Sequence, residues 1–208
     1  MQTPVLDLQI ERLNLGGTQV LGQINLHVMP SQTVALLGPS GVGKTTLLRI
    51  IAGLETRHAG RCDVQGRVGM VFQEPTLLPW RSVLENLCIP TGITAQTAQQ
   101  ALDDVGLAGR EHDFPQQLSL GQQRRLSLAR AFAIKPDLLL MDEPFVSLDP
   151  NLVEDMIALF QRLQHRHGAA TILVTHVATE AKRLSDRIIT LSGSPAQITD
   201  DHPNIGAP

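Results

Sequence analysis

The chain has no tyrosine, one tryptophan and only two cysteines among its 208 residues. Cys62 and Cys88 form no CxxC pair and no metal-ligand spacing, so we interpret them as free, partly buried thiols in a reducing compartment. No apolar run approaches the roughly 20 residues that a membrane-spanning helix needs. The N-terminal segment MQTPVLDLQIERL has no positive region followed by an apolar one, so we expect no signal peptide. These absences predict a soluble, cytoplasmic chain.

The chain also lacks an excess of charge of either sign. Its formal net charge is −3, which provides no global basic field for nucleic acid or anionic lipid, although Arg124 and Arg125 form a local basic pair. Hydrophobic residues make up 42% and charged residues 18%, as in a globular protein. We therefore expect a folded protein of one or two domains that does not bind nucleic acid.

Two kinds of strand pattern are present. Residues 5–13 and 20–28 alternate apolar and polar side chains around a Gly16–Gly17 turn, which predicts an antiparallel pair. Three short runs that are apolar throughout predict strands buried on both faces, and they lie at 33–38, 137–144 and 170–176.

Helices are predicted between the buried strands. An apolar periodicity marks residues 45–54 and 150–168, and strands that alternate with helices indicate a parallel α/β core. After a further strand at 67–73, residues 74–135 are helical and loop-like, punctuated by prolines, and form an insertion into that core. After a last strand at 187–193, the polar tail to Pro208 is expected to be irregular.

A phosphate-binding loop follows the first buried strand. Residues 38–45 read GPSGVGKT and fit the pattern G-x-x-x-x-G-K-[ST], in the strand-to-helix context that the pattern requires. An ordinary glycine-rich turn is the disfavoured alternative. Backbone N–H groups of such a loop surround phosphates, Lys44 is predicted to contact the β- and γ-phosphates, and Thr45 to hold Mg²⁺. The predicted nucleotide-binding residues are Gly38, Pro39, Ser40, Gly41, Val42, Gly43, Lys44, Thr45 and Thr46.

Two adjacent acids end the second buried strand. Asp142 is placed to order Mg²⁺, and Glu143 to polarise an attacking water. Acids that merely cap a strand end are the alternative, which the phosphate-binding loop disfavours. Together these features predict a P-loop NTPase, a class that includes kinases, GTPases, helicases and transport ATPases. The sequence has no [NT]KxD element, which argues against a GTPase.

The segment LSLGQ at 118–122 narrows the class. It precedes the strand that carries Asp142, and here the chain resembles the ATP-binding-cassette (ABC) ATPases, whose LSGGQ signature has this place in the order. Gln73 matches the Q-loop of that family, SLD at 147–149 the D-loop and His176 the switch histidine. The resemblance covers about residues 5–198, and FQEPTLLPWRSVLENL is most similar to importers of the nitrate, sulfonate and taurine group.

The resemblance implies a fold and a division of the chain. The fold would be an α/β P-loop NTPase of RecA-like type, with a mainly parallel sheet, a small N-terminal antiparallel β subdomain and an inserted α-helical subdomain. One ABC ATPase domain would span 1–208. Residues 1–73 and 136–208 would form the nucleotide-binding core with its β subdomain, and 74–135 the helical signature subdomain.

The resemblance also implies how the site is completed. Two cassettes, as a homodimer or a pair, would face head to tail, with ATP held by Lys44 of one and by Ser119, Gly121 and Gln122 of the other. Ser119 is placed at a helix N-terminus, which favours an anion, and it can cap its own helix at the same time.

The catalytic and metal roles follow from the same resemblance. Glu143, His176 and Lys44 are the predicted catalytic residues. The predicted Mg²⁺ ligands are Thr45, Gln73 and Asp142.

The chain departs from the family pattern at three positions. The third signature residue is Leu120 instead of glycine, which narrows the approach of a phosphate or of the partner's backbone. Leu15 stands where the family usually has an aromatic residue that stacks on adenine. Val177 follows the switch histidine, where a polar or acidic residue is usual.

The predicted function is ATP binding and hydrolysis in an ABC importer, with ATP and Mg²⁺ as ligands. The partners would be integral-membrane permease subunits and a periplasmic or extracellular solute-binding protein, and the chain would lie on the inner face of the cell membrane through the permease. Trp80, Leu77 and Leu78 would either fill the helical core or line a groove for a permease helix. A soluble ABC ATPase, or the ATPase of an export or lipid-transport system, is the alternative.

Overall fold

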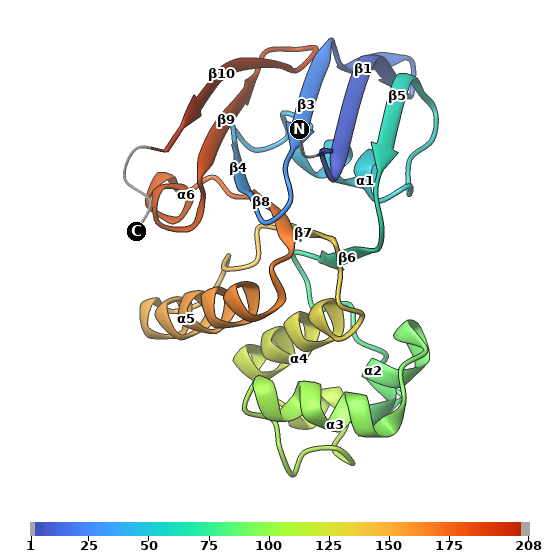
Figure 1. The fold of residues 1–208 in the computed structure, drawn as a ribbon, viewed down its shortest axis with the longest axis vertical. Helices are drawn as coiled ribbons and strands as arrows, with labels where there is room; N and C mark the ends of the chain where they lie inside the picture. Colours follow the sequence, from blue (N-terminus) through green and yellow to red (C-terminus); the bar gives the residue numbers. More distant parts are fainter. Residues whose placement is uncertain (1–2, 205–208) are drawn as a thin grey trace. The chain divides into compact units, whose positions relative to one another are not determined.

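The computed structural model describes residues 3–204, which form two compact units. Unit 1 comprises Met1–Met70, Asp137–Glu143 and Ala169–Pro208, and unit 2 comprises Val71–Pro136 and Pro144–Gly168. Figure 1 labels the elements of both units, which are described here one at a time. Within the described residues, no helix combines the length and the apolar character that crossing a membrane requires.

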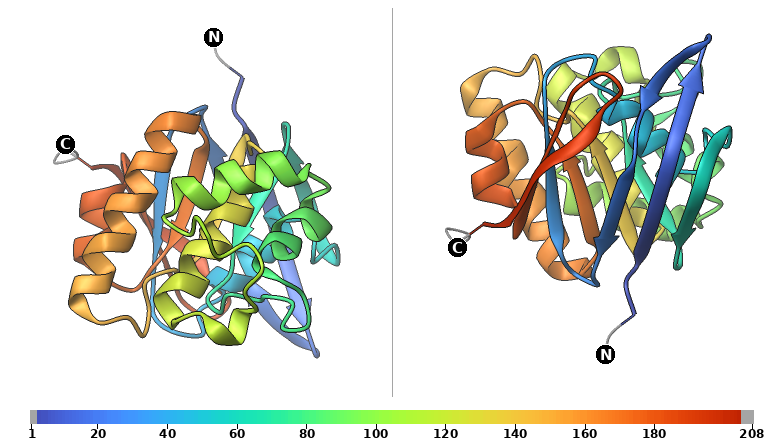
Figure 2. Two further views of the ribbon diagram at one scale, coloured as in Figure 1. Left: turned by 90° about the horizontal axis from the view of Figure 1, so that it is seen from below. Right: turned by 90° about the horizontal axis from the view of Figure 1, so that it is seen from above.

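A four-stranded antiparallel sheet occupies the N-terminal part of unit 1. Its central strand β1 (Leu6–Leu15) pairs with β2 (Thr18–Leu21), β3 (Ile24–Val28) and β5 (His58–Val64), which lie side by side in Figure 2. Gly16 has a φ of 57° and Gly17 one of 83°, as a two-residue hairpin turn needs. The predicted antiparallel pairing is confirmed, but the strand expected at 20–28 is two strands, because the chain leaves the ladder between β2 and β3.

The second sheet of unit 1 carries the buried strands. Its order is β10-β9-β4-β8-β7-β6, and β4 pairs in parallel with both β8 and β9, as β8 does with β7. The predicted parallel core is therefore confirmed. The strands are β4 (Thr33–Leu37), β6 (Val68–Val71), β7 (Leu138–Asp142), β8 (Ala170–Val174), β9 (Arg187–Ser192) and β10 (Gln197–Pro203).

Helices cover both faces of β4. Val34 and Leu36 belong to the main core, which also contains residues of α1 (Lys44–Ile51). The intervening Ala35 packs instead with Ala181 of α6 (Ala178–Leu184). Because neighbouring side chains of a strand point to opposite faces, this double cover explains why the strand is apolar throughout.

Unit 2 is helical. It contains α2 (Val83–Thr91), α3 (Ala95–Asp104), the short 3₁₀ turn η1 (Pro115–Gln117), α4 (Leu120–Ala133) and α5 (Pro150–His167), drawn from green to orange in Figure 1. The helical character expected of 74–135 is confirmed. The unit also includes α5, which the sequence analysis assigned to the nucleotide-binding core, and the proposed domain boundaries stay a prediction.

Two strands have no counterpart in the sequence analysis. β5 is rich in polar and small residues, and β10 has the sequence QITDDHP, so neither shows a clear strand pattern. β5 is held by its ladder with β1, and β10 by its ladder with β9 and by an ion pair of 2.5 Å between Arg187 and Asp201. The expectation of an irregular tail is wrong for Gln197–Pro203, and residues 205–208 lie outside the described residues.

Gly60 lets β5 approach β1, and replacing it tests this pairing. Its φ is 121°, and an added Cβ would overlap the carbonyl oxygen of Gln9. We expect Gly60→Ala to lower the free energy of unfolding by about 3 kcal/mol or more, since both strain and a backbone clash arise. The matched control Gly16→Ala meets no atom within 4 Å, so its left-handed φ alone should cost about 1 kcal/mol. Denaturant unfolding measures both, and equal losses would contradict the clash.

Candidate active site

The turn between β4 and α1 accepts only glycine at two positions. Gly38 has a φ of 154°, and a Cβ there would lie 2.5 Å from the carbonyl oxygen of Leu191. Gly43, the N-cap of α1, has a φ of 115°, and its Cβ would lie 2.8 Å from the Leu21 side chain. In this part of the described chain no side chain caps α1, so the N–H groups of its first turn remain available to an anion.

Lys44 is the buried charge of this turn. Its side chain is 5% exposed, and Nζ donates to the carbonyl oxygens of Gly38 at 2.8 Å and Pro39 at 3.0 Å. The same Nζ lies 3.8 Å from Oε1 of Glu143. The loop thus holds an ammonium group at its centre, where it can meet phosphate oxygens.

Asp142 ends β7 and contacts the start of α1. Its Oδ1 accepts a hydrogen bond of 3.0 Å from the Thr45 hydroxyl, and the residue is 4% exposed. Burial raises the pKa of Asp142, the Thr45 hydrogen bond opposes that shift, and the charge of Glu143 adds to it. A hydroxyl and a carboxylate beside a phosphate-binding loop fit Mg²⁺, which takes one or two protein oxygens and completes its shell with water and phosphate.

Glu143 and His176 face each other at the carboxyl ends of β7 and β8. Oε2 of Glu143 lies 3.3 Å from Nδ1 of His176. Glu143 has a φ of 45°, which is strained for a residue other than glycine, and its N–H donates to the Val174 carbonyl at 3.0 Å. Unit 1 therefore brings together Lys44, Glu143 and His176, as the sequence analysis expected.

Ser119 and Gln122, in unit 2, form a capping box at the start of α4. The N–H of Gln122 donates to Ser119 Oγ at 3.3 Å, and the N–H of Ser119 donates to Gln122 Oε1 at 2.9 Å. Ser119 only accepts in this bond, so its own hydroxyl proton remains available to an anion. Leu120, the first helical residue, is 45% exposed. Capping and anion binding are thus compatible.

Gly121 packs closely against α5 within unit 2. A Cβ at this position would lie 2.8 Å from two carbon atoms of Leu152 at the start of α5. The sequence analysis gave Gly121 only a role toward phosphate, because a contact with a residue 31 positions later in the chain has no local signal. The roles of Gln73, Ser119, Gly121 and Gln122 toward a nucleotide stay predictions.

Arg124 joins three segments of unit 2 and was not predicted as a functional residue. It is 5% exposed, and its guanidinium donates to the carbonyl oxygen of Gln73 and, at 3.3 Å, to that of Val146. Burial lowers its pKa. Arg124 shares the face of α4 that carries the buried Leu128 and Ala131, and this periodicity was the available signal.

The structure also shows the surroundings of the apolar and cysteine side chains that the sequence analysis discussed. Trp80 is 69% exposed and so does not fill the helical core, whereas Leu77 and Leu78 are partly buried. Leu15, the last residue of β1, packs partly buried against the core of unit 1, and its contact with adenine stays a prediction. Cys62 and Cys88 are free and partly buried, as predicted.

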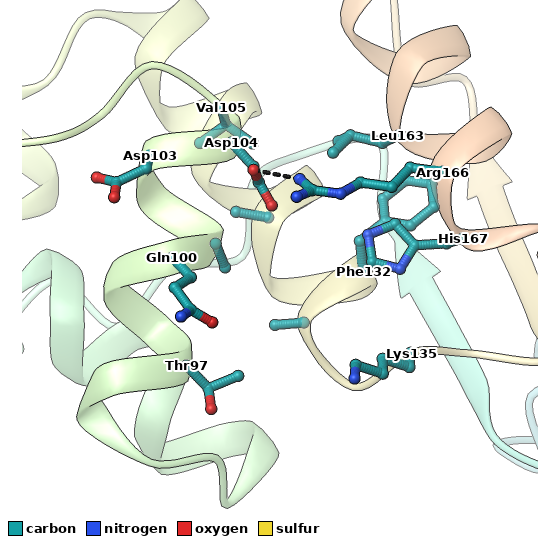
Figure 3. Close-up of a pocket in the computed structure, with 13 residues that line it drawn as sticks. Thr97, Gln100, Asp103, Asp104, Val105, Phe132, Lys135, Leu163, Arg166 and His167 are labelled. Carbon is teal, nitrogen blue, oxygen red and sulfur yellow. Dashed lines mark hydrogen bonds and ion pairs between the residues drawn. The ribbon is translucent and has the colours of Figure 1, made fainter.

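A cavity of about 680 Å³ lies within unit 2. Figure 3 shows it between α3 and the C-terminal ends of α4 and α5. On its wall, Arg166 forms an ion pair with Asp104. The rings of Phe132 and His167 lie 5.3 Å apart, and burial lowers the pKa of His167. No predicted site residue lines this cavity.

Comparison with known proteins decides the class of the site. Residues 21–146, which include the phosphate-binding loop, LSLGQ and both acids, match the family model of the ABC transporter ATP-binding domain. The chain belongs to this family. It is therefore an ABC ATPase, and the predicted resemblance, fold class and ATP hydrolysis are confirmed.

Several curated relatives cover most of the chain. An aliphatic sulfonates import ATP-binding protein SsuB 2 of Burkholderia cenocepacia is 40% identical, over 95% of this chain and 77% of its own length. An SsuB 1 protein of Rhodococcus jostii is 48% identical, over 84% and 74%, and an SsuB protein of Granulibacter bethesdensis 44%, over 91% and 81%.

Two solved structures of ABC cassettes have the same fold as this chain. A dimeric ATP-binding cassette in a post-hydrolysis state, bound to ADP and Pi, superposes with a TM-score of 0.84 at 27% identity. The match covers 97% of this chain and 99% of that one. A dimeric bacterial ABC transporter cassette gives 0.83 with the same coverage. The α/β cassette fold is thus shared over nearly the whole length.

Burial of Asp142 predicts a stability that depends on pH. The pKa of this carboxyl is raised above its ordinary value of about 3.9, so the folded state binds the proton more tightly than the unfolded state. The protonated Asp142 carboxyl therefore contributes to the stability of the folded state at low pH, and this contribution is lost as pH rises through the raised pKa. We expect Asp142→Asn, which has no charge to bury, to be more stable than the wild type at pH 7.

Thermal unfolding between pH 4 and pH 8 measures this difference, which should narrow toward pH 4. The exposed Asp103, on α3, offers a matched control, and Asp103→Asn should leave the curve unchanged. An Asp142→Asn variant that is less stable than the wild type at pH 7 would contradict the expected cost of burial.

Proposed function

We propose that this chain is the ATP-hydrolysing subunit of an ABC importer. The observation that carries the proposal is the convergence of Lys44, Glu143 and His176 at the phosphate-binding loop of unit 1. A buried cation beside a helix N-terminus can stabilise phosphate charge, and a nearby carboxylate can position a water for phosphoryl transfer.

Each of these three side chains has its own role in the hydrolysis of ATP. Lys44 exchanges the carbonyl oxygens of Gly38 and Pro39 for oxygens of the β- and γ-phosphates. Glu143 orients a water and accepts its proton as the water oxygen attacks the γ-phosphorus and the bond to the β-phosphate oxygen breaks. His176 donates a hydrogen bond to the γ-phosphate, and ADP and phosphate are released.

Thr45 and Asp142 would hold Mg²⁺. Their oxygens lie 3.0 Å apart beside the loop, and Gln73 would add its amide oxygen. When bound, Mg²⁺ neutralises charge on the β- and γ-phosphates.

A second cassette would complete the site. Ser119 keeps its hydroxyl proton free, and the first N–H groups of α4 are orphan donors that favour an anion. These donors would bind the γ-phosphate held by the other copy. The dimeric cassettes among the solved structures support this arrangement.

The transport assignment draws on the relatives. They are aliphatic sulfonates import ATP-binding proteins at 40 to 48% identity, so we propose an organic sulfonate as the cargo, delivered by a solute-binding protein outside the membrane. The chain would lie on the cytoplasmic face of the membrane, bound to two permease subunits. A soluble or exporting ABC ATPase is the second candidate, which the relatives do not favour.

Trp80 and Ile89 supply a surface for the permease within unit 2. They are 69% and 53% exposed, so both side chains are available to a partner, and aromatic residues are enriched at protein interfaces. Both lie in or just after the segment that resembles importers.

Glu143→Gln tests the catalytic assignment. Because glutamine cannot accept the proton of water, we expect kcat for ATP hydrolysis to fall on the order of 100-fold while ATP binding is retained. Phosphate release and binding of a fluorescent ATP analogue measure the two. Glu11→Gln changes an exposed glutamate of β1 and is the control. Unchanged turnover in Glu143→Gln would remove Glu143 from the mechanism.

Capture from solubilised membranes tests the transport assignment. The tagged chain should recover a multi-span permease, and Trp80→Ala should recover less because the apolar anchor is lost. Leu54→Ala, which removes another exposed apolar side chain, is the control and should not reduce recovery. Recovery of ribosomes or nucleic acid in place of a permease would favour the soluble alternative.

A further inference from the structure

The helix that follows His176 begins without a side-chain cap. Val177 is the N-cap of α6 and has no group that accepts a hydrogen bond. The N–H of Val177 instead donates to the hydroxyl of Thr175 at 3.0 Å. The residues on either side of His176 are therefore joined to each other by a bond that bridges it.

Thr175 is fixed from two further directions. It is 2% exposed, and its own N–H donates to the Leu36 carbonyl of β4 at 3.3 Å. Its hydroxyl has one proton, which it donates to Oε2 of Glu180 at 2.5 Å. Glu180 thus satisfies a buried hydroxyl, and losing this acceptor would leave that hydroxyl proton unpaired.

The imidazole of His176 has little packing of its own. Its side chain is 52% exposed, its Nδ1 lies 3.3 Å from Oε2 of Glu143, and its charge also interacts with the carboxylate of Glu180. Its place is therefore set by the backbone turn from Thr175 to Val177. A turn that shifted by a fraction of an ångström would carry the ring away from the Glu143 carboxylate.

We infer that Glu180 is a positioning residue for ATP hydrolysis, because it fixes through Thr175 the turn that holds His176 against Glu143. This inference rests on the proposed role of His176. The turn itself does not use the Val177 side chain, because the N–H of Val177 donates to the Thr175 hydroxyl that Glu180 holds.

Removal of the acceptor is the first test. Glu180→Leu should lower kcat for ATP hydrolysis by about 10- to 100-fold and leave KM for ATP unchanged, since small misplacements of a catalytic group act on the chemical step. Glu180→Gln keeps an oxygen that accepts the Thr175 proton and should retain most of the wild-type kcat. Equal losses in both variants would contradict the hydrogen-bond account.

Removal of the donor is the second test. Thr175→Val breaks this bond and also removes the acceptor of the Val177 N–H, so it should lower kcat at least as far as Glu180→Leu, and the double variant should be no slower than Thr175→Val alone. Thr179→Val changes an exposed threonine of the same helix and should leave kcat unchanged. Additive losses in the double variant would overturn the inference.

The His176→Ala background separates this inference from the proposed function. If Glu180 acts through the imidazole, Glu180→Leu should not lower kcat further in that background, although thermal unfolding reports any loss of stability. A further fall in kcat would mean that Glu180 acts otherwise. If His176→Ala itself left kcat unchanged, the proposed role of His176 would fail. If His176→Ala is slow and Glu180→Leu is as fast as the wild type, only the positioning role fails.

Discussion

The buried ammonium of Lys44 sets the constraints on the site in unit 1. A charge that is 5% exposed must be surrounded by oxygens, and the carbonyl groups of Gly38 and Pro39 supply them at 2.8 and 3.0 Å. Those carbonyl groups can turn inward only because Gly38 and Gly43 adopt backbone conformations in which a Cβ would collide with Leu191 or Leu21. The same geometry leaves the N–H groups of α1 available to phosphate.

Two adjacent acids take different roles because their surroundings differ. Asp142 still belongs to β7, where it is buried and accepts from Thr45, so its pKa is raised. Glu143 leaves the strand with a left-handed φ and faces Lys44 and His176. A carboxylate that holds a cation and a carboxylate that receives a proton can thus be neighbours in sequence. The strained φ of Glu143 lies at the position proposed to be catalytic.

Helix α4 contacts several segments of unit 2. The start of α4 carries the Ser119 cap, its second residue Gly121 packs closely on the Leu152 side chain, and Arg124 donates to the carbonyl groups of Gln73 and Val146. The signature, the Q-loop and the segment before α5 are therefore connected by one side chain. Leu120 points to solvent beside this cap, so its departure from the family pattern leaves the capping box intact.

The phosphate-binding loop, the two acids after β7 and the parallel core could be predicted from the sequence, because each follows from a local pattern in which strand, turn and helix are contiguous. His176 was predicted from the order of motifs in the ABC family. The strands β5 and β10 could not be predicted, because their polar sequences form strands only through ladders with β1 and β9. The contact of Gly121 with Leu152 and the hydrogen bond from Thr175 to Glu180 also arise only in the folded chain. Such roles depend on contacts between side chains whose partners no local pattern specifies, so they emerge only once the chain has folded.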